Sequence, residues 1–176
     1  MRIVGGKYRH RIIQWPDDQT NTRPTKDRVR EAVFSAIGDI ENSVVLDLYS
    51  GSGAMGLEAL SREARFCYFV DIAPIALKTI RNNINSLSIP EENFQIISRK
   101  DIDAINFVDK KVDLLILDPP YKQGKYNEII SACGNILSEK CIIVCESDRK
   151  LNFDEDEYKK IKEYKYGETI VTILWK

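Results

Sequence analysis

The residues with the clearest chemical potential are Asp118-Pro119-Pro120-Tyr121, which directly follow the most apolar run of the chain. Proline fixes φ and pushes the residue before it out of the helical region, so Asp118 and the carbonyl of Pro119 are expected to be held rigidly. A carboxylate and a carbonyl can both accept hydrogen bonds from a planar exocyclic amine, and this localises the nitrogen lone pair toward an electrophile. Tyr121 adds a ring on which a flipped nucleobase can stack. The alternative is a proline-rich strand exit with a surface tyrosine.

A second pattern, Gly51-Ser-Gly53-Ala-Met-Gly56, is a G-x-G-x-x-G loop between a strand-like and a helix-like run. Glycine is needed where the backbone turns tightly or approaches a ligand closely. Asp71 lies 20 residues after Gly51, at the end of the next strand-like run, where a carboxylate can accept from ribose hydroxyls. Together they predict a nucleoside-bearing cofactor, either a dinucleotide or S-adenosylmethionine. The competing interpretation is a tight turn with Asp71 as a helix cap.

Asp47 lies within an apolar strand-like run just before this loop. An unpaired carboxylate is costly to bury. We therefore expect Asp47 to accept hydrogen bonds from loop N–H groups, or to lie near the charged end of a ligand. Support of the loop is favoured over a direct part in catalysis.

These residues are positioned by alternating strand-like and helix-like runs, which predict a parallel α/β sheet covered on both faces. Right-handed crossovers make such a sheet doubly wound, and ligands lie outside the carboxyl ends of its strands. The expected strands are 44–49, 66–70, 94–97, 112–117 and 141–145, and the expected helices are 54–62, 75–87, 102–108 and 126–137. Residues 158–166 and 169–175, joined at Gly167, predict a C-terminal antiparallel hairpin.

The first 30 residues are basic in a chain whose formal net charge is −1. They contain eight Lys or Arg and three Asp, a sum of +5, so the remainder sums to −6. Such asymmetry indicates a surface for a polyanion, although a solvated arginine-rich end fits equally well. Gly5-Gly6 predicts a β-hairpin over 2–13, and the apolar spacing after Thr25 predicts a helix ending at Gly38. We expect an N-terminal extension over 1–24 and a main domain over 25–176.

Composition excludes several other classes. The chain has 176 residues, of which 43% are hydrophobic and 30% charged, as in an ordinary globular domain. No apolar run approaches the roughly 20 residues of a membrane helix, and the first residues do not form a secretory signal. The four cysteines follow neither a disulfide nor a zinc spacing, so no metal is expected. We expect a cytoplasmic monomer without membrane contact.

Three runs of the sequence together resemble the RsmD family, and the likeness covers nearly the whole chain. They are TRPTKDRVREAVFSAI, VLDLYSGSGAMGLEALSR and LDPPY. The D-P-P-Y motif is shared with DNA adenine methyltransferases, whereas Thr22–Glu31 is much more discriminating. The resemblance implies a Rossmann-like class I methyltransferase fold. It further implies transfer of a methyl group from S-adenosylmethionine to the N2 amine of a guanine in small-subunit (16S) ribosomal RNA, free or within a ribosomal particle.

The resemblance also implies residue roles. Asp118, Pro119, Pro120 and Tyr121 match the catalytic motif. The implied cofactor contacts are Asp47, Tyr49, Gly51, Gly53, Asp71, Ile72, Asp101 and Asp118, with Asp71 on the ribose and Asp101 at the adenine. Tyr49 stands where Phe or Cys is common. The expected RNA-binding residues are Lys7, Arg9, Arg11, Arg23, Thr25 and Arg28, the last three near the mouth of the active site.

Three other functions remain open at this point. An adenine-N6 methyltransferase acting on DNA or RNA would use the same motif on another base. An NAD-dependent dehydrogenase would explain the glycine loop and Asp71, but it would give Asp118–Tyr121 no function. A non-catalytic RNA-binding module would require neither intact motif.

Overall fold

The computed structural model describes residues 1–16, 27–120 and 125–176, and its centre is a seven-stranded sheet. The strands follow one another in space in the order β3-β2-β1-β4-β5-β7-β6. The first five pair in parallel, and β7 runs antiparallel between β5 and β6. The strands are β1 (Val44–Leu48), β2 (Phe66–Asp71), β3 (Phe94–Ser98), β4 (Val112–Leu117), β5 (Leu137–Ser147), β6 (Lys160–Tyr166) and β7 (Thr169–Trp175).

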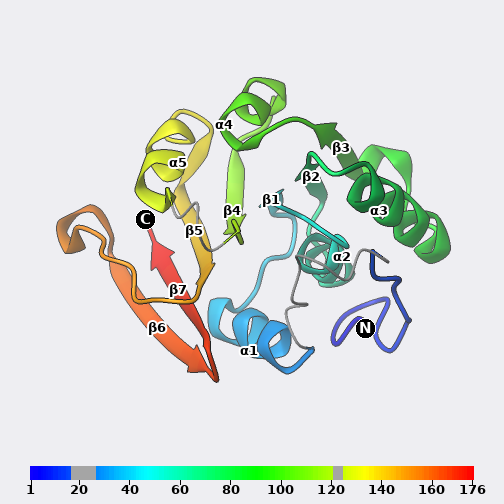
Figure 1. Cartoon of the computed structure of the whole chain (residues 1–176), viewed down its shortest axis with the longest axis horizontal. Coiled ribbons are helices and arrows are strands. Elements are labelled where there is room, and N and C mark those ends of the chain that lie inside the picture. The colour runs from blue at the N-terminus through cyan, green and yellow to red at the C-terminus, as the bar shows by residue number, and fades with distance from the viewer. Residues whose placement is uncertain (17–26, 121–124) are drawn as a thin grey trace.

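Helices cover both faces of the sheet, so each face has its own apolar core (Figure 1). One face carries α1 (Asp27–Ile37), α2 (Ala54–Ser61) and α3 (Pro74–Leu87), and the other carries α4 (Asp101–Ala104) and α5 (Tyr126–Ala132). All five residues of β1 are buried, as expected of a parallel strand covered on both sides. The predicted doubly wound α/β fold is confirmed, together with its C-terminal antiparallel hairpin.

The prediction of a helix over 126–137 was wrong at its C-terminal end. Helix α5 stops at Ala132, and the amide of Gly134 donates to the Ser131 carbonyl at 3.0 Å in a turn. The chain then enters β5 at Leu137, four residues earlier than predicted, because Leu137 pairs with Val112 at the start of β4. Apolar periodicity alone does not reveal the turn at 133–136 that separates α5 from β5.

The N-terminal segment is less regular than the predicted hairpin. Within residues 1–16, a single isolated bridge between Arg2 and Ile12 joins the two arms. Gly6 has φ +73°, and a Cβ there would lie 1.7 Å from the carbonyl oxygen of Ser61, so the tip packs tightly on the end of α2. Ile3 and Ile13 are buried in the same core as α1 and α2. The predicted domain boundary after residue 24 falls outside the described residues and stays a prediction.

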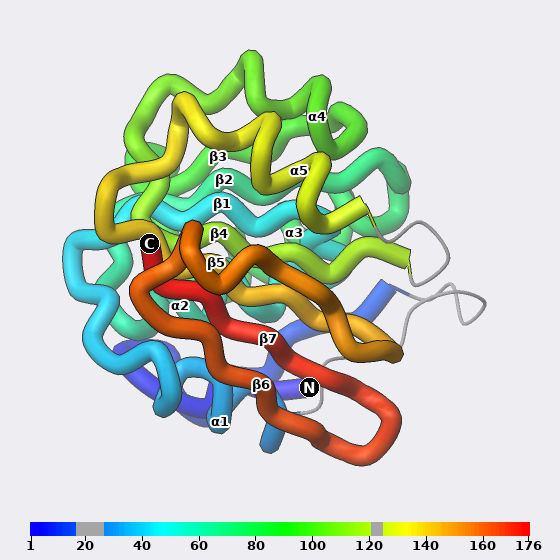
Figure 2. The backbone as a smooth tube through the Cα atoms, turned by 90° about the vertical axis from the view of Figure 1, so that its left-hand side faces the viewer, coloured from blue at the N-terminus to red at the C-terminus, as the bar shows by residue number. Residues whose placement is uncertain are grey.

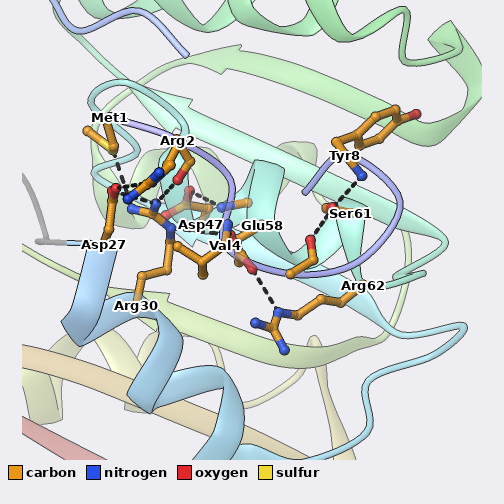
Figure 3. A network of polar contacts seen from close by, with 12 residues as sticks. Met1, Arg2, Val4, Tyr8, Asp27, Arg30, Asp47, Glu58, Ser61 and Arg62 are labelled. Atoms are coloured by element: carbon orange, nitrogen blue, oxygen red, sulfur yellow. Dashed lines mark hydrogen bonds and ion pairs between the residues drawn. The ribbon is translucent and has the colours of Figure 1, made fainter. Parts of the chain in front are cut away.

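A buried carboxylate ties this segment to α1 and α2 (Figure 3). The side chains of Glu58, on α2, and Arg30, on α1, are both fully buried, and their Oε2 and Nε atoms lie 3.3 Å apart. The Glu58 carboxylate also accepts from Arg62 Nε at 2.8 Å and from the Val4 amide at 2.8 Å. Arg30 in turn donates to the carbonyl of Arg2 and to Asp27. The Glu58 carboxylate therefore joins the N-terminal segment and α1 to α2, the helix that follows the glycine loop.

Replacing this carboxylate tests how strongly the three segments depend on it. Glu58→Gln removes the buried anion that faces the buried Arg30 guanidinium, so we expect the free energy of unfolding to fall by about 3 kcal/mol. Chemical denaturation measures this loss. The matched control is Glu91→Gln, because Glu91 forms an exposed pair with Arg81 at 2.9 Å and exposed pairs contribute little. Equal effects of the two substitutions would contradict the interpretation.

Candidate active site

The glycine loop joins β1 to α2, and its three glycines serve different purposes. Gly51 and Gly53 have φ values of +55° and +78°, in the left-handed region that favours glycine. A Cβ on Gly51 would meet nothing within 4 Å, so this turn faces open space where a ligand can approach. A Cβ on Gly56 would lie 2.4 Å from Cε1 of Phe69 and 2.6 Å from Sγ of Cys67. Gly56 thus permits close packing of α2 on β2.

Two carboxylates hold this loop from neighbouring strands. Asp47 Oδ2 accepts from the Gly56 amide at 3.0 Å, which is the kind of bond predicted for a loop-supporting carboxylate. Asp71 Oδ2 accepts from the Gly51 amide at 2.9 Å. Ser50 links β1 to β2, because its Oγ donates to the Asp47 carbonyl and accepts from the Val70 amide. The loop is therefore fixed before any ligand arrives.

Asp71 also holds the turn that leads into the next helix, but it does not cap that helix as the competing interpretation expected, because α3 has no side-chain hydrogen bond at its N-cap. Its Oδ1 accepts from the amide of Ala73, the residue that precedes α3, at 2.9 Å. A carboxylate offers about four lone pairs. Asp71 is partly exposed, so acceptor capacity remains for a ribose after both described bonds are made. Support of the turn and ligand binding are compatible at this residue.

A pair that the sequence did not indicate spans the site between β1 and α4. The Tyr49 hydroxyl donates to Asp101 Oδ2 at 2.5 Å, and Asp101 Oδ1 accepts from the Ile102 amide. Tyr49 has φ +66°, a left-handed conformation that is strained for a bulky residue and that recurs at functional sites. Burial and the Asp101 carboxylate raise the pKa of Tyr49, so the phenol remains a donor. Ile72 and Ile102, 59% and 38% exposed, offer apolar surface at the same edge of the sheet.

Asp118 emerges beside the glycine loop. Leu48 pairs with Leu117 in the parallel register of β1 and β4, so Tyr49 and Asp118 leave neighbouring strands at the same level. Pro119 is buried and Pro120 is exposed. Asp118 itself is partly exposed, so a substrate can reach it. Tyr121, the fourth residue of the motif, lies outside the described residues.

Neighbouring carboxylates disfavour the charged forms of Asp118 and Asp47 at this edge. Burial, then the carboxylates of Glu146 and Asp47, raise the pKa of Asp118 well above its usual value. Burial, opposed by the Gly56 amide and reinforced by Asp71, raises the pKa of Asp47 to about 7. Glu146, near the end of β5, was not anticipated, because the sequence predicted that this strand would stop at Cys145. A site with this much negative potential is suited to a positively charged ligand.

The predicted RNA-binding residues are spread over the surface. Lys7 and Arg9 are exposed at the tip of the N-terminal segment, which contacts Ser61 at the end of α2 farthest from the glycine loop. Arg11 donates to the carbonyl of Ser86 near the end of α3. Figure 2 shows this tip away from the strand ends that lead to Asp118. Arg28 is exposed at the start of α1, whereas Arg23 and Thr25 lie outside the described residues.

Asn83 joins the N-terminal segment to the glycine loop. Its amide nitrogen donates to the carbonyl of Ser52 at 2.9 Å, and its oxygen accepts from the Gln14 amide at 2.7 Å. Asn83 is 1% exposed, so this link is part of the interior. No pattern in the sequence indicated it, because Asn83 stands among polar residues of a helix.

Other features of the described part of the chain bear on ligands. The four cysteines are free and buried. Residues 1–16, 27–120 and 125–176 contain no group of three or more His, Cys, Asp or Glu that could hold a metal ion. None of the helices in those ranges is long and apolar enough to cross a membrane.

The strand order, the glycine loop after β1 and the acidic residue ending β2 define a Rossmann-like class I methyltransferase fold. A family model described as "Conserved hypothetical protein 95" matches residues 1–175, and the chain belongs to this family, which is the RsmD family that its motifs indicated.

Individual relatives agree with this family. The chain is 33% identical to the putative rRNA methyltransferase YlbH of Bacillus subtilis, over 88% of this chain and 86% of the relative. It is 31% identical to the ribosomal RNA small subunit methyltransferase D of Escherichia coli, over 84% and 75% of the two chains. The solved structure of the putative methyltransferase yhhF from Escherichia coli superposes with a TM-score of 0.84 at 27% identity, over 100% of this chain and 97% of that one.

The raised pKa of Asp47 predicts a pH-dependent stability. Because its folded-state pKa of about 7 lies above its ordinary value of 3.8, the folded state binds this proton more tightly, and the associated stability is lost as pH rises from about 4 to 7. Asp47→Asn does not titrate and keeps an oxygen for the Gly56 amide. Relative to wild type, the variant should gain about 3 kcal/mol in free energy of unfolding between pH 5 and pH 8, because pH 5 lies two units below the folded-state pKa and each unit is worth about 1.36 kcal/mol. Urea denaturation of both proteins at both pH values measures this; a constant difference would contradict it.

Proposed function

We propose that this protein transfers a methyl group from S-adenosylmethionine to the N2 amine of a guanine in small-subunit ribosomal RNA. The observation that carries the proposal is the β1–β4 register, which brings Asp118 beside the open turn at Gly51. The family and the names of the relatives support a ribosomal RNA substrate. Work on such an RNA supports the cytoplasm as the place of action.

The described residues suit S-adenosylmethionine. Gly51 leaves room for close approach of a ligand, and Asp71 has acceptors that remain for ribose hydroxyls. The exposed apolar side chains of Ile72 and Ile102 suit one face of an adenine ring. Tyr49 and Asp101 stand where a polar contact to the cofactor is expected. When bound, the cofactor supplies an electrophilic methyl group on a positively charged sulfur.

Charge favours this cofactor in particular. Besides burial, Glu146 and Asp47 raise the pKa of Asp118 and Asp71 raises that of Asp47, so the site favours a cation over a neutral or anionic group. A sulfonium is cationic, whereas the pyrophosphate of a dinucleotide is anionic. A nearby cation also lowers the pKa of Asp118 and favours its carboxylate form. The carboxyl groups therefore favour binding of the sulfonium donor. The bound sulfonium in turn favours the charged form of Asp118, which accepts hydrogen bonds from the guanine NH₂.

The transfer needs positioning more than a strong base. Asp118 and the Pro119 carbonyl accept hydrogen bonds from the guanine NH₂ and aim its lone pair at the methyl carbon. As the C–N bond forms, the C–S bond breaks and its electron pair stays on sulfur. The amine becomes cationic in this step, and the Asp118 carboxylate stabilises that charge. The proton that leaves nitrogen passes to Asp118 or to water, and stacking of the guanine falls to Tyr121.

Identification of the modified nucleoside tests the proposal directly. The protein is incubated with small-subunit ribosomal RNA, or with assembling particles, and methyl-labelled S-adenosylmethionine. Digestion and mass spectrometry should reveal N2-methylguanosine, and Asp118→Ala should lower turnover at least about a thousandfold, as expected for loss of electrostatic stabilisation and positioning together. Label in N6-methyladenosine would show the adenine-directed alternative.

A binding measurement separates catalysis from folding in the Asp118→Ala protein. Calorimetry with S-adenosylhomocysteine should give an affinity close to that of wild type, because the cofactor loop is held by Asp47 and Asp71. Wild-type turnover in this variant would exclude the role assigned to Asp118.

The exposed cations of the N-terminal tip are proposed to contact RNA phosphates beyond the target nucleotide. Arg9→Ala combined with Arg11→Ala should weaken RNA binding about three- to tenfold and reduce the slope of log K against log salt by about 1 to 2. Fluorescence anisotropy at several salt concentrations measures both. Because phosphate contacts carry no sequence information, the methylated position should not change. An unaltered salt slope would remove these residues from the RNA interface.

A further inference from the structure

A cavity that has no part in the chemistry above opens beside the proposed active site. It has a volume of about 270 Å³ and lies between the start of α5 and the segment after β5. Its lining residues are Lys125, Tyr126, Asn127, Glu128, Arg149, Lys150, Leu151, Asn152 and Phe153. Because small-molecule pockets usually occupy about 300–1,000 Å³, this cavity suits a single nucleotide better than a whole cofactor.

The cavity lies next to Asp118. Leu117 pairs with Cys145, so the end of β4 and the end of β5 leave the sheet side by side, and Arg149 follows shortly after β5. The Tyr126 hydroxyl donates to the carbonyl of Glu146 at 2.6 Å, so one wall of the cavity is anchored to the strand that carries Glu146. Tyr126 is also close enough to Asp118 for that carboxyl group to help raise its pKa. The cavity therefore adjoins the place where the target guanine is proposed to bind.

The lining favours an anion although the chain as a whole is slightly acidic. Lys125, Arg149 and Lys150 outnumber the single carboxylate of Glu128. Lys125 pairs with Glu128 at 3.4 Å and Arg149 with Asp148 at 3.6 Å, and all four of these side chains are at least 44% exposed. Exposed pairs are weak, so both cations can exchange these partners for a phosphate. The acidic residues 154–157 do not line the cavity.

The remaining lining groups suit a nucleobase. Phe153 is half-buried, and its ring meets that of Tyr158 edge-on at 6.1 Å between centroids. Asn127 and Asn152 carry amides that can donate to and accept from a base edge, and the Asn127 side chain already donates to the carbonyl of Asn152. Cations together with an aromatic face are the usual composition of a single-stranded nucleic-acid site.

We infer that this cavity binds the nucleotide next to the target guanine in single-stranded RNA, with its phosphate on Arg149 and Lys150 and its base against Phe153. The inference rests on the proposed function and deepens it. Extruding a base toward Asp118 separates it from its neighbours in the stack, and a neighbouring nucleotide held in this cavity keeps the strand in that extruded conformation. The cavity thus acts on RNA binding, whereas cofactor binding is left to the glycine loop.

The first test removes the two cations. The combined variant Arg149→Gln, Lys150→Gln is compared with wild type by fluorescence anisotropy, using the small-subunit RNA fragment that wild type methylates and saturating S-adenosylhomocysteine. RNA affinity should fall at least about fivefold, and the salt slope should drop by about 0.7 for each phosphate that the variant no longer neutralises. The affinity for S-adenosylhomocysteine alone should stay within about twofold. The matched control is Lys111→Gln, Lys140→Gln, which removes the same charge near the opposite ends of β4 and β5.

The second test concerns the base. Phe153→Leu keeps an apolar side chain against Tyr158 but lacks a ring face, so RNA affinity should fall about tenfold, as for loss of one stacked base. Phe153→Tyr keeps the ring and should bind RNA like wild type. Equal loss in the Leu and Tyr variants would refute stacking at this residue and with it the assignment of the cavity.

The outcomes distinguish this inference from the proposed function. If wild type forms N2-methylguanosine while the cavity variants bind RNA as wild type does, the cavity assignment is overturned and the proposed function stands. An equal loss of RNA affinity in the Lys111→Gln, Lys140→Gln control would show that surface charge attracts RNA without a specific site. That result would also overturn the cavity assignment. If wild type neither methylates nor binds the RNA, the proposed function fails first and the cavity assignment fails with it.

Discussion

The pairing of β1 with β4 is the constraint on which the site depends. These strands are far apart in the sequence but adjacent in the sheet, and β1 lies where the strand order reverses, with β2 on one side and β4 on the other. The connections to those neighbours carry helices to opposite faces, so a crevice opens outside the carboxyl ends of the two central strands. The glycine loop and Asp118 border this crevice because Leu48 and Leu117 are in register. If β4 were shifted by one residue against β1, every side chain of β4 would point to the opposite face of the sheet.

The crevice places carboxyl groups where their charges are unfavourable in the isolated protein. Asp47 is 3% exposed, and its hydrogen bond with the Gly56 amide offsets only part of the desolvation. Such groups would be costly if they served folding alone. Their arrangement becomes favourable when a cation enters, since the ligand then supplies the missing counter-charge. A sulfonium donor and an amine that becomes cationic during attack are two successive cations that the same carboxylates can stabilise.

Much of this arrangement could be predicted from the sequence, because its signals are local. The glycine spacing, the apolar runs of β1 and β4 and the prolines after Asp118 each constrain the residues next to them. The pairs Tyr49–Asp101 and Arg30–Glu58 were not predictable in this way, because each joins segments whose separation only the fold determines. The end of α5 was misplaced for a different reason. Apolar residues continue on both sides of the turn at Gly134, and periodicity does not distinguish a short helix followed by a strand from one longer helix.

The position of the N-terminal tip also follows from a contact that the sequence does not show. Gly6 packs on Ser61 at one end of α2, while the glycine loop forms the other end. The helix has eight residues, so the tip lies about 12 Å from the loop at 1.5 Å per residue. Basic residues at that distance can contact phosphates along an RNA but cannot orient the target base. Orientation must then come from groups nearer Asp118, and the cations after β5 are closer to it along the sheet edge. The charge asymmetry of the sequence thus predicts a surface for RNA without predicting the part of it that selects the nucleotide.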